Sequence, residues 1–259
     1  MCESRYQMRS ITRISSTGRS EDRDALARES SVQVRLNGNT IGLPSCTPCE
    51  LAYLAVGFLF THHLIESYEQ IVSVSIKKTD TYTHRIDVTC MNANTAGKAG
   101  EQEKRGVFSA EQSSAVYTGQ PPSAFNISSA SILACMRQFE NATELFQRTG
   151  ATHSCGLYAP LGYQLILEDI RRSNALDKLI GYCLTHRVDT TNKILLVSGR
   201  ISVDLVDRAT RLQIPVVASP SAPTDWAIEL ANEKDITIIG FARGGQMNIY
   251  THAERILLG

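Results

Sequence analysis

Hydrophobic and polar residues alternate in the first third of the chain, the pattern of strands with one buried face. Val32, Val34 and Leu36 alternate before the turn signal Asn37-Gly38, and Ile41 and Leu43 resume the alternation after it. This pattern predicts a β-hairpin. Two further strands are expected at 71–77 and 84–90.

An apolar segment with helical spacing follows the predicted hairpin. Thr47 is placed to cap a helix, Pro48 suits the first helical position, and Glu50 completes a capping box. We therefore expect a helix from residue 47 to about residue 62, with Leu51 to Phe60 as core material.

From Asn126 onward, amphipathic helices alternate with short apolar strands. Helices are expected at 127–140, 173–186, 202–212 and 224–234. Strands are expected at 152–159, 163–168, 193–198, 216–219, 236–241 and 247–250, followed by a short helical tail. This alternation predicts an α/β fold, in which a layered sheet carries helices on its faces.

These patterns divide the chain into three parts. The Ser- and Arg-rich residues 1–28 are expected to form a disordered tail, because few of them are apolar. Residues 29–125 are expected to form a small α+β subdomain that ends in a long polar loop, and residues 126–259 a larger α/β/α domain.

Composition narrows the class of protein. With 42% hydrophobic and 20% charged residues and a formal net charge of zero, the chain is expected to be globular and to bind neither nucleic acid nor a membrane. No apolar run approaches the roughly 20 residues of a membrane span, and no signal peptide is visible, so a cytoplasmic location is expected. The seven scattered cysteines fit a reducing compartment.

Three polar corners follow predicted strands, where ligands bind in open α/β sheets. They are Ser198-Gly199-Arg200, Ser221-Ala222-Pro223-Thr224 and Phe241-Ala242-Arg243-Gly244-Gly245-Gln246. Glycine lets backbone N–H groups approach an anion, and arginine binds phosphate through two parallel hydrogen bonds. We expect the corners to form one cradle for a diphosphate. Ordinary turns, a helix cap at Thr224 and a hairpin tip at Gly244-Gly245 are the structural alternatives.

Other residues with possible chemistry lie outside these corners. His153 can act as an acid, a base or a hydrogen-bond donor, and Asp169 and Asn174 combine capping with ligand contacts. Cys46 and Cys49 form the one C-x-x-C motif, which supports either a reactive thiol or simple packing. No metal site is expected.

The order of these motifs resembles the FdhD family of formate dehydrogenase accessory sulfurtransferases, from about residue 30 to 251. T-G-A-T-H at 149–153 is similar to the family's T-G-G-x-H, and residues 168–178 are similar to its E-D-V-G-R-H-N-A-x-D-K. S-G-R, S-A-P-T and G-F-A-R-G-G follow in order, and N-G, T-P and G-F-L precede them.

The resemblance implies a three-layer α/β/α cytidine-deaminase-like domain with a smaller N-terminal subdomain, and a homodimer. It implies that sulfur from a cysteine desulfurase passes to the molybdenum bis-guanine-dinucleotide cofactor before insertion into formate dehydrogenase. GDP would be a surrogate for that cofactor, and residues 241–246 match the family's cofactor-binding stretch.

This sequence departs from the family at the sulfur-transfer loop. Ala115 and Thr118 stand where the family has two cysteines, and neither side chain can carry a persulfide. Three functions therefore compete: a sulfurtransferase that uses another thiol, such as Cys46 or Cys49; a non-catalytic cofactor carrier; and a nucleotide-acting enzyme that uses His153 and Asp169.

Overall fold

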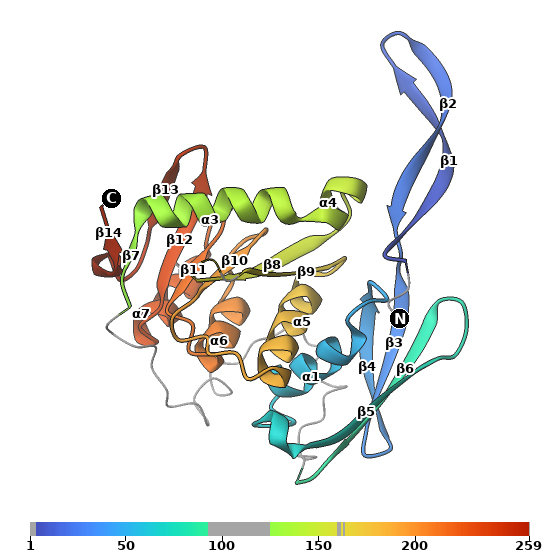
Figure 1. The fold of residues 1–259 in the computed structure, drawn as a ribbon, viewed down its shortest axis with the longest axis horizontal. Helices are drawn as coiled ribbons and strands as arrows, with labels where there is room; N and C mark the ends of the chain where they lie inside the picture. The colour runs from blue at the N-terminus through green and yellow to red at the C-terminus, as the bar shows by residue number, and fades with distance from the viewer. Residues whose placement is uncertain (1–3, 93–124, 160–161, 163, 259) are drawn as a thin grey trace.

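The larger part of the protein is built on a six-stranded sheet with helices on both faces (Figure 1). The computed structural model describes residues 4–92, 125–159, 162 and 164–258. The strand order is β13-β12-β11-β10-β8-β9. In chain order the strands are β8 (His153–Tyr158), β9 (Gln164–Asp169), β10 (Ile194–Val197), β11 (Val216–Ala218), β12 (Thr237–Arg243) and β13 (Gln246–Ile249).

The three central strands, β10 to β12, are parallel, and β8, β9 and β13 run antiparallel to their neighbours. Every residue of β10 is buried, as expected for a strand covered on both faces. Its sequence Ile-Leu-Leu-Val supplies apolar side chains to both faces. The strands predicted for this half of the chain are present.

Helices form two layers around this sheet. The helix α3 (Ser129–Ala142) packs with Ile194, Leu196 and Ile239 on one face, and the short helix α4 (Glu144–Thr149) follows it. The helices on the other face are α5 (Arg172–Thr185), α6 (Val203–Arg211) and α7 (Asp225–Glu233). Odd-numbered residues of β10 face this second layer.

The N-terminal part forms a second, four-stranded sheet in the order β4-β3-β6-β5. Its elements are β3 (Ser30–Leu36), β4 (Asn39–Cys46), α1 (Leu51–Thr61), the 3-10 turn η1 (Tyr68–Gln70), β5 (Ile71–Lys78) and β6 (Thr83–Cys90). The predicted hairpin around Asn37-Gly38 and the strands near 71–77 and 84–90 are confirmed.

Two glycines bring the two parts together. The helices α1 and α5 cross so closely that a Cβ atom at Gly57 would lie 1.8 Å from the Asp177 carbonyl oxygen. A Cβ atom at Gly181 would lie 1.9 Å from the Tyr53 carbonyl oxygen. One of the two hydrophobic clusters among the described residues then runs from Val34 through Leu54 and Leu176 to Leu195.

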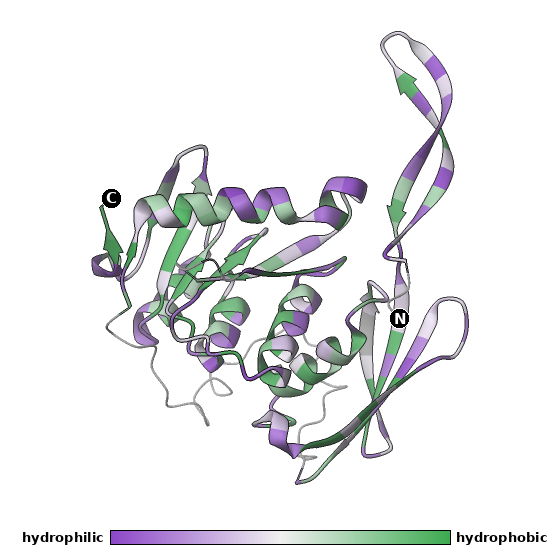
Figure 2. Cartoon of the chain, viewed as in Figure 1, coloured by the Kyte–Doolittle hydropathy of each residue, from purple (hydrophilic) through white to green (hydrophobic). Residues whose placement is uncertain are grey.

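The N-terminal segment contradicts the sequence-based expectation of a tail. Residues Tyr6–Ser15 (β1) and Gly18–Ala27 (β2) pair as an antiparallel ribbon, here called the arm, which projects from the body (Figure 1). Most of its residues are exposed, and Figure 2 shows polar and apolar residues mixed along it. Hydrophobic patterning misses such a ribbon because neither of its faces is buried.

The start of α1 also differs from the expectation. The helix begins at Leu51, and its N-cap is Glu50, which has a left-handed backbone and makes no capping hydrogen bond. Thr47 is buried and binds elsewhere, so the predicted capping box does not form. The chain ends in a 3-10 turn, η3 (Ala253–Arg255), and in β14 (Ile256–Leu257), which pairs with β7 (Ile127–Ser128).

Among the residues that the structure describes, no helix is long and apolar enough to cross a membrane.

Candidate functional site

The polar corners predicted from the sequence meet at one end of the six-stranded sheet, where its parallel strands have their carboxyl ends. The parallel strands β10 and β11 end there, and the antiparallel strand β8 begins there. The Ser219 hydroxyl donates to the Gly199 carbonyl at 2.6 Å, and the Phe241 amide donates to the Ser221 carbonyl at 3.1 Å. The Ser154 amide donates to the Ser198 hydroxyl at 3.0 Å. The corners therefore form one hydrogen-bonded surface.

The middle corner has structural contacts of its own. The Thr224 hydroxyl accepts a hydrogen bond from the Ala227 amide, so it caps α7. The Ala222 carbonyl accepts from the Ile201 amide, and Pro223 pairs with Ile201 in an isolated bridge. These contacts fix the first and second corners relative to each other.

The third corner contains backbone strain. Phe241 has φ of 51°, a left-handed conformation that is rare for an aromatic residue, and the β12–β13 pairing shifts register beside it. The turn that follows exposes Arg243, Gly244, Gly245 and Gln246. Backbone strain of this kind is concentrated at functional sites, including those that hold ligands.

A pocket of about 550 Å³ opens beside this end of the sheet, on the side of α3 and α4. Its wall combines the aromatic rings of Phe139 and Phe146 with His153, Ser198 and Pro220. Its size is in the range of small-molecule sites, and its mixed lining suits a ligand with one planar and one polar end. Arg200, Thr224 and Arg243 do not line it.

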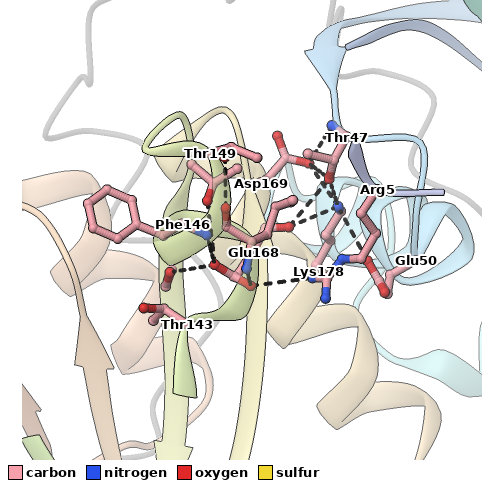
Figure 3. A network of polar contacts seen from close by, with 12 residues as sticks. Arg5, Thr47, Glu50, Thr143, Phe146, Thr149, Glu168, Asp169 and Lys178 are labelled. Carbon is pink, nitrogen blue, oxygen red and sulfur yellow. Dashed lines mark hydrogen bonds and ion pairs between the residues drawn. The ribbon is translucent and has the colours of Figure 1, made fainter. Parts of the chain in front are cut away.

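Asp169 belongs to a buried polar network (Figure 3), and Asn174 is hydrogen-bonded to it. The Asp169 carboxylate lies 2.8 Å from the Lys178 ammonium, and both side chains are fully buried. The backbone amide and the hydroxyl of Thr47 both donate to Asp169 at 3.0 Å. The side-chain amide of Asn174 donates to the same carboxylate at 3.1 Å. This network joins the N-terminal sheet to β9 and α5.

Glu168 stabilises a helix that precedes it in the chain. Its carboxylate accepts hydrogen bonds from the Leu145 and Phe146 amides at 2.9 Å, so it stabilises the start of α4 rather than that of α5 (Figure 3). Arg5 at the base of the arm lies 3.6 Å from it. A buried carboxylate at a helix N-terminus is favourable because it satisfies free N–H groups.

His153 has a cationic neighbour that the sequence did not indicate. Burial and the positive charge of Arg172 lower the pKa of the His153 imidazole. The Arg172 side chain lies against Gly199, where a Cβ atom would be 3.0 Å from the arginine Nε. His153 lies opposite Asp169 in the β8–β9 register, but among the described residues no hydrogen bond joins their side chains.

The described thiols are poorly suited to sulfur chemistry. Cys46, Cys90, Cys135, Cys155 and Cys183 are free, and all are buried. Burial raises the pKa of Cys46, Cys155 and Cys183 to about 12, which disfavours the reactive thiolate. Cys49 is equally buried and is not a free thiol. Ala115 and Thr118 lie outside the described residues, and no metal-ligating cluster occurs within the described part of the chain.

Comparison with known proteins identifies relatives over nearly the whole chain. The family model described as the FdhD/NarQ family matches residues 27–257. A sulfur carrier protein FdhD from Shouchella clausii is 31% identical over 243 residues, which cover 91% of each chain. The protein of the same name from Staphylococcus haemolyticus is 33% identical over 244 residues, which cover 90% of each chain.

A solved structure shares the fold. It comes from Desulfotalea psychrophila, and its name describes a proposed formate dehydrogenase accessory protein. The two chains are 24% identical and superpose with a TM-score of 0.79, over 98% of this chain and all of the other. The mixed α/β fold with several sheets is thus common to both, and the family match, together with the curated relatives, shows that this chain belongs to the FdhD/NarQ family.

Proposed function

We propose that this protein is a formate dehydrogenase accessory protein that binds the guanine-nucleotide part of the molybdenum bis-guanine-dinucleotide cofactor. The observation that carries the proposal is the union of three polar corners at one end of the sheet, next to a pocket of about 550 Å³. The exposed Arg200 and Arg243 supply positive charge for phosphates. The aromatic pocket wall suits a purine ring.

The names of the relatives also support a proposal for the proteins with which this chain works. The two curated relatives described above are named sulfur carriers, so a cysteine desulfurase is the proposed sulfur donor and formate dehydrogenase the proposed client. A homodimer, a cytoplasmic location and a cytidine-deaminase-like topology belong to the same proposal. The cofactor is cargo here, since it would leave with the client enzyme.

We favour a carrier that holds the cofactor without transferring sulfur itself. A persulfide forms on a thiolate, whereas the free thiols in the described part of the chain are buried and have raised pKa values. The family's two loop cysteines are Ala115 and Thr118 in this sequence. Nucleotide binding does not require either cysteine.

The test is calorimetric GDP binding to the wild type and to Arg243→Ala, with Arg19→Ala as the control. Arg19 is an exposed arginine near the tip of the arm. Loss of a charge-assisted hydrogen bond to phosphate should weaken binding by roughly 10- to 100-fold in Arg243→Ala only. Equal affinity in all three proteins would remove Arg243 from the site.

The same samples distinguish a carrier from a sulfurtransferase. After incubation with a cysteine desulfurase and cysteine, intact-mass spectrometry should detect GDP-binding protein without added sulfur. A sulfane adduct on Cys46 or another thiol would contradict the carrier and restore the sulfurtransferase.

A further inference from the structure

Arg172 has no hydrogen-bond or ion-pair partner among the residues that the structure describes. Its Nε atom is buried and has no hydrogen-bond partner, and the residue forms no ion pair within the described part of the chain. The neighbouring carboxylates are already matched with other cations. Asp169 pairs with Lys178, and Asp177 pairs with Arg208. A buried guanidinium donor that lacks an acceptor is costly, and in a native structure it needs an explanation.

Two features of the surroundings add to the positive potential at Arg172, while the Asp169 carboxylate accepts a hydrogen bond from the adjacent Arg171 amide and pairs with Lys178. Burial lowers the pKa of the His153 imidazole, and like-charge repulsion from the nearby Arg172 guanidinium lowers it further. Arg172 is also the first residue of α5, a 14-residue helix whose N-cap makes no side-chain hydrogen bond. The positive end of the helix therefore adds to the same region.

Gly199 explains why the arginine can lie there. A side chain at this position would place its Cβ atom 3.0 Å from Nε and 3.4 Å from Cζ of Arg172. The absence of a side chain leaves room for the guanidinium against the backbone of the first polar corner. Sequence reasoning assigned this glycine to backbone contact with an anion, whereas its position indicates that it accommodates an arginine.

We propose that Arg172, between His153 and Gly199, is an anion subsite that binds a phosphoryl group of the nucleotide. The subsite deepens the proposed function and depends on it only for the identity of the ligand. The Arg172 fork would donate to phosphoryl oxygens, and His153 would add a second donor when it is protonated. The exposed Arg200 and Arg243 would contact more distal parts of the same ligand.

The test uses matched substitutions at adjacent arginines. Arg172→Gln removes the partly buried cation, and Arg171→Gln removes an exposed one next to it. Arg172→Lys retains the positive charge but loses the planar guanidinium group, which can donate two parallel hydrogen bonds. GDP and inorganic pyrophosphate are titrated into each full-length protein by calorimetry. We expect a loss of at least tenfold in affinity for both ligands in Arg172→Gln, a smaller loss in Arg172→Lys, and a change of less than twofold in Arg171→Gln.

A second readout separates binding from structural damage. The His153 pKa is followed by NMR, with His153→Gln for assignment. It should rise in free Arg172→Gln, because a like charge has been removed, and it should rise in the wild type when pyrophosphate binds. Gly199→Ala should weaken binding as well, because the added Cβ atom displaces the guanidinium.

The outcomes distinguish the two proposals. If the wild type binds GDP, and folded Arg172→Gln binds it equally well, the subsite is wrong and the proposed function stands. If the wild type binds pyrophosphate through Arg172 but not GDP, the subsite stands and the nucleotide function is wrong. If the wild type binds neither ligand, both proposals are wrong.

Discussion

Single buried side chains in this protein hold protonation states that differ from those of the unfolded chain. His62 is the clearest example. Its ring packs on Phe58 with centroids 4.0 Å apart, and its Nδ1 donates to the Phe58 carbonyl at 2.9 Å. Burial, with the nearby charge of Arg208, lowers the His62 pKa to about 4. The folded protein therefore contains a neutral imidazole well below pH 6.

This residue should make stability depend on pH. Between its unfolded pKa of 6.5 and its folded pKa of about 4, the unfolded chain binds a proton that the folded chain does not. The contribution is fully present above pH 6.5 and is lost as the pH falls, by roughly 2 kcal/mol between pH 7 and pH 5. Urea unfolding at both pH values should show this loss in the wild type and in His186→Gln, an exposed control, but not in His62→Gln.

A second buried group, Asp177, also changes how the free energy of unfolding depends on pH. It does not affect the comparison of His62→Gln with the wild type. Burial raises the Asp177 pKa to about 6, which acts in the opposite direction as the pH rises. Because Asp177 is present in the variant and in the wild type, their difference isolates His62. An unchanged pH dependence in His62→Gln would show that folding does not lower the His62 pKa.

At the scale of elements, close helix packing depends on glycine. Gly181→Ala would place a methyl group 1.9 Å from the Tyr53 carbonyl oxygen, so α1 and α5 must separate. We expect a loss of about 3 kcal/mol or more in the free energy of unfolding. Gly42→Ala is the control, because nothing lies within 4 Å of the added Cβ atom there. If urea unfolding gave the same free energy of unfolding for Gly181→Ala and Gly42→Ala, the close packing of α1 on α5 would be contradicted.

The same scale shows what the sequence could and could not predict. Apolar runs such as Ile194–Val197 identify buried strands because the residue type itself is diagnostic. The arm carries no such signal, since both of its faces are solvated. The corners after β10 to β12 were found by their glycine and hydroxyl residues. Arg172 was missed, because its missing partner and its contact with Gly199 depend on tertiary structure.

At the scale of the whole molecule, two sheets share one core and one buried ion-pair network. Side chains from Val34 to Leu195 belong to the same cluster, and Thr47 of the N-terminal part binds Asp169 and Lys178 of the C-terminal part. The C-terminal part has a second cluster of its own under α3, whereas the buried hydrophobic residues of the N-terminal sheet all belong to the shared cluster. Such a molecule should unfold in one cooperative transition.

Lys178→Met tests this coupling, because it leaves the buried Asp169 carboxylate without its cation. Breaking a buried pair in this way costs about 3–5 kcal/mol. Arg187→Met is the matched control: Arg187 and Glu69 form an exposed pair at 3.2 Å, whose loss should cost less than about 1 kcal/mol.

Fluorescence of the only tryptophan, Trp226 on α7, reports the C-terminal part, and far-UV circular dichroism reports both parts. Both signals should shift together to a lower urea midpoint in Lys178→Met. A dichroism transition that precedes the fluorescence change would mean that the N-terminal sheet unfolds alone, and that the network does not join the two parts.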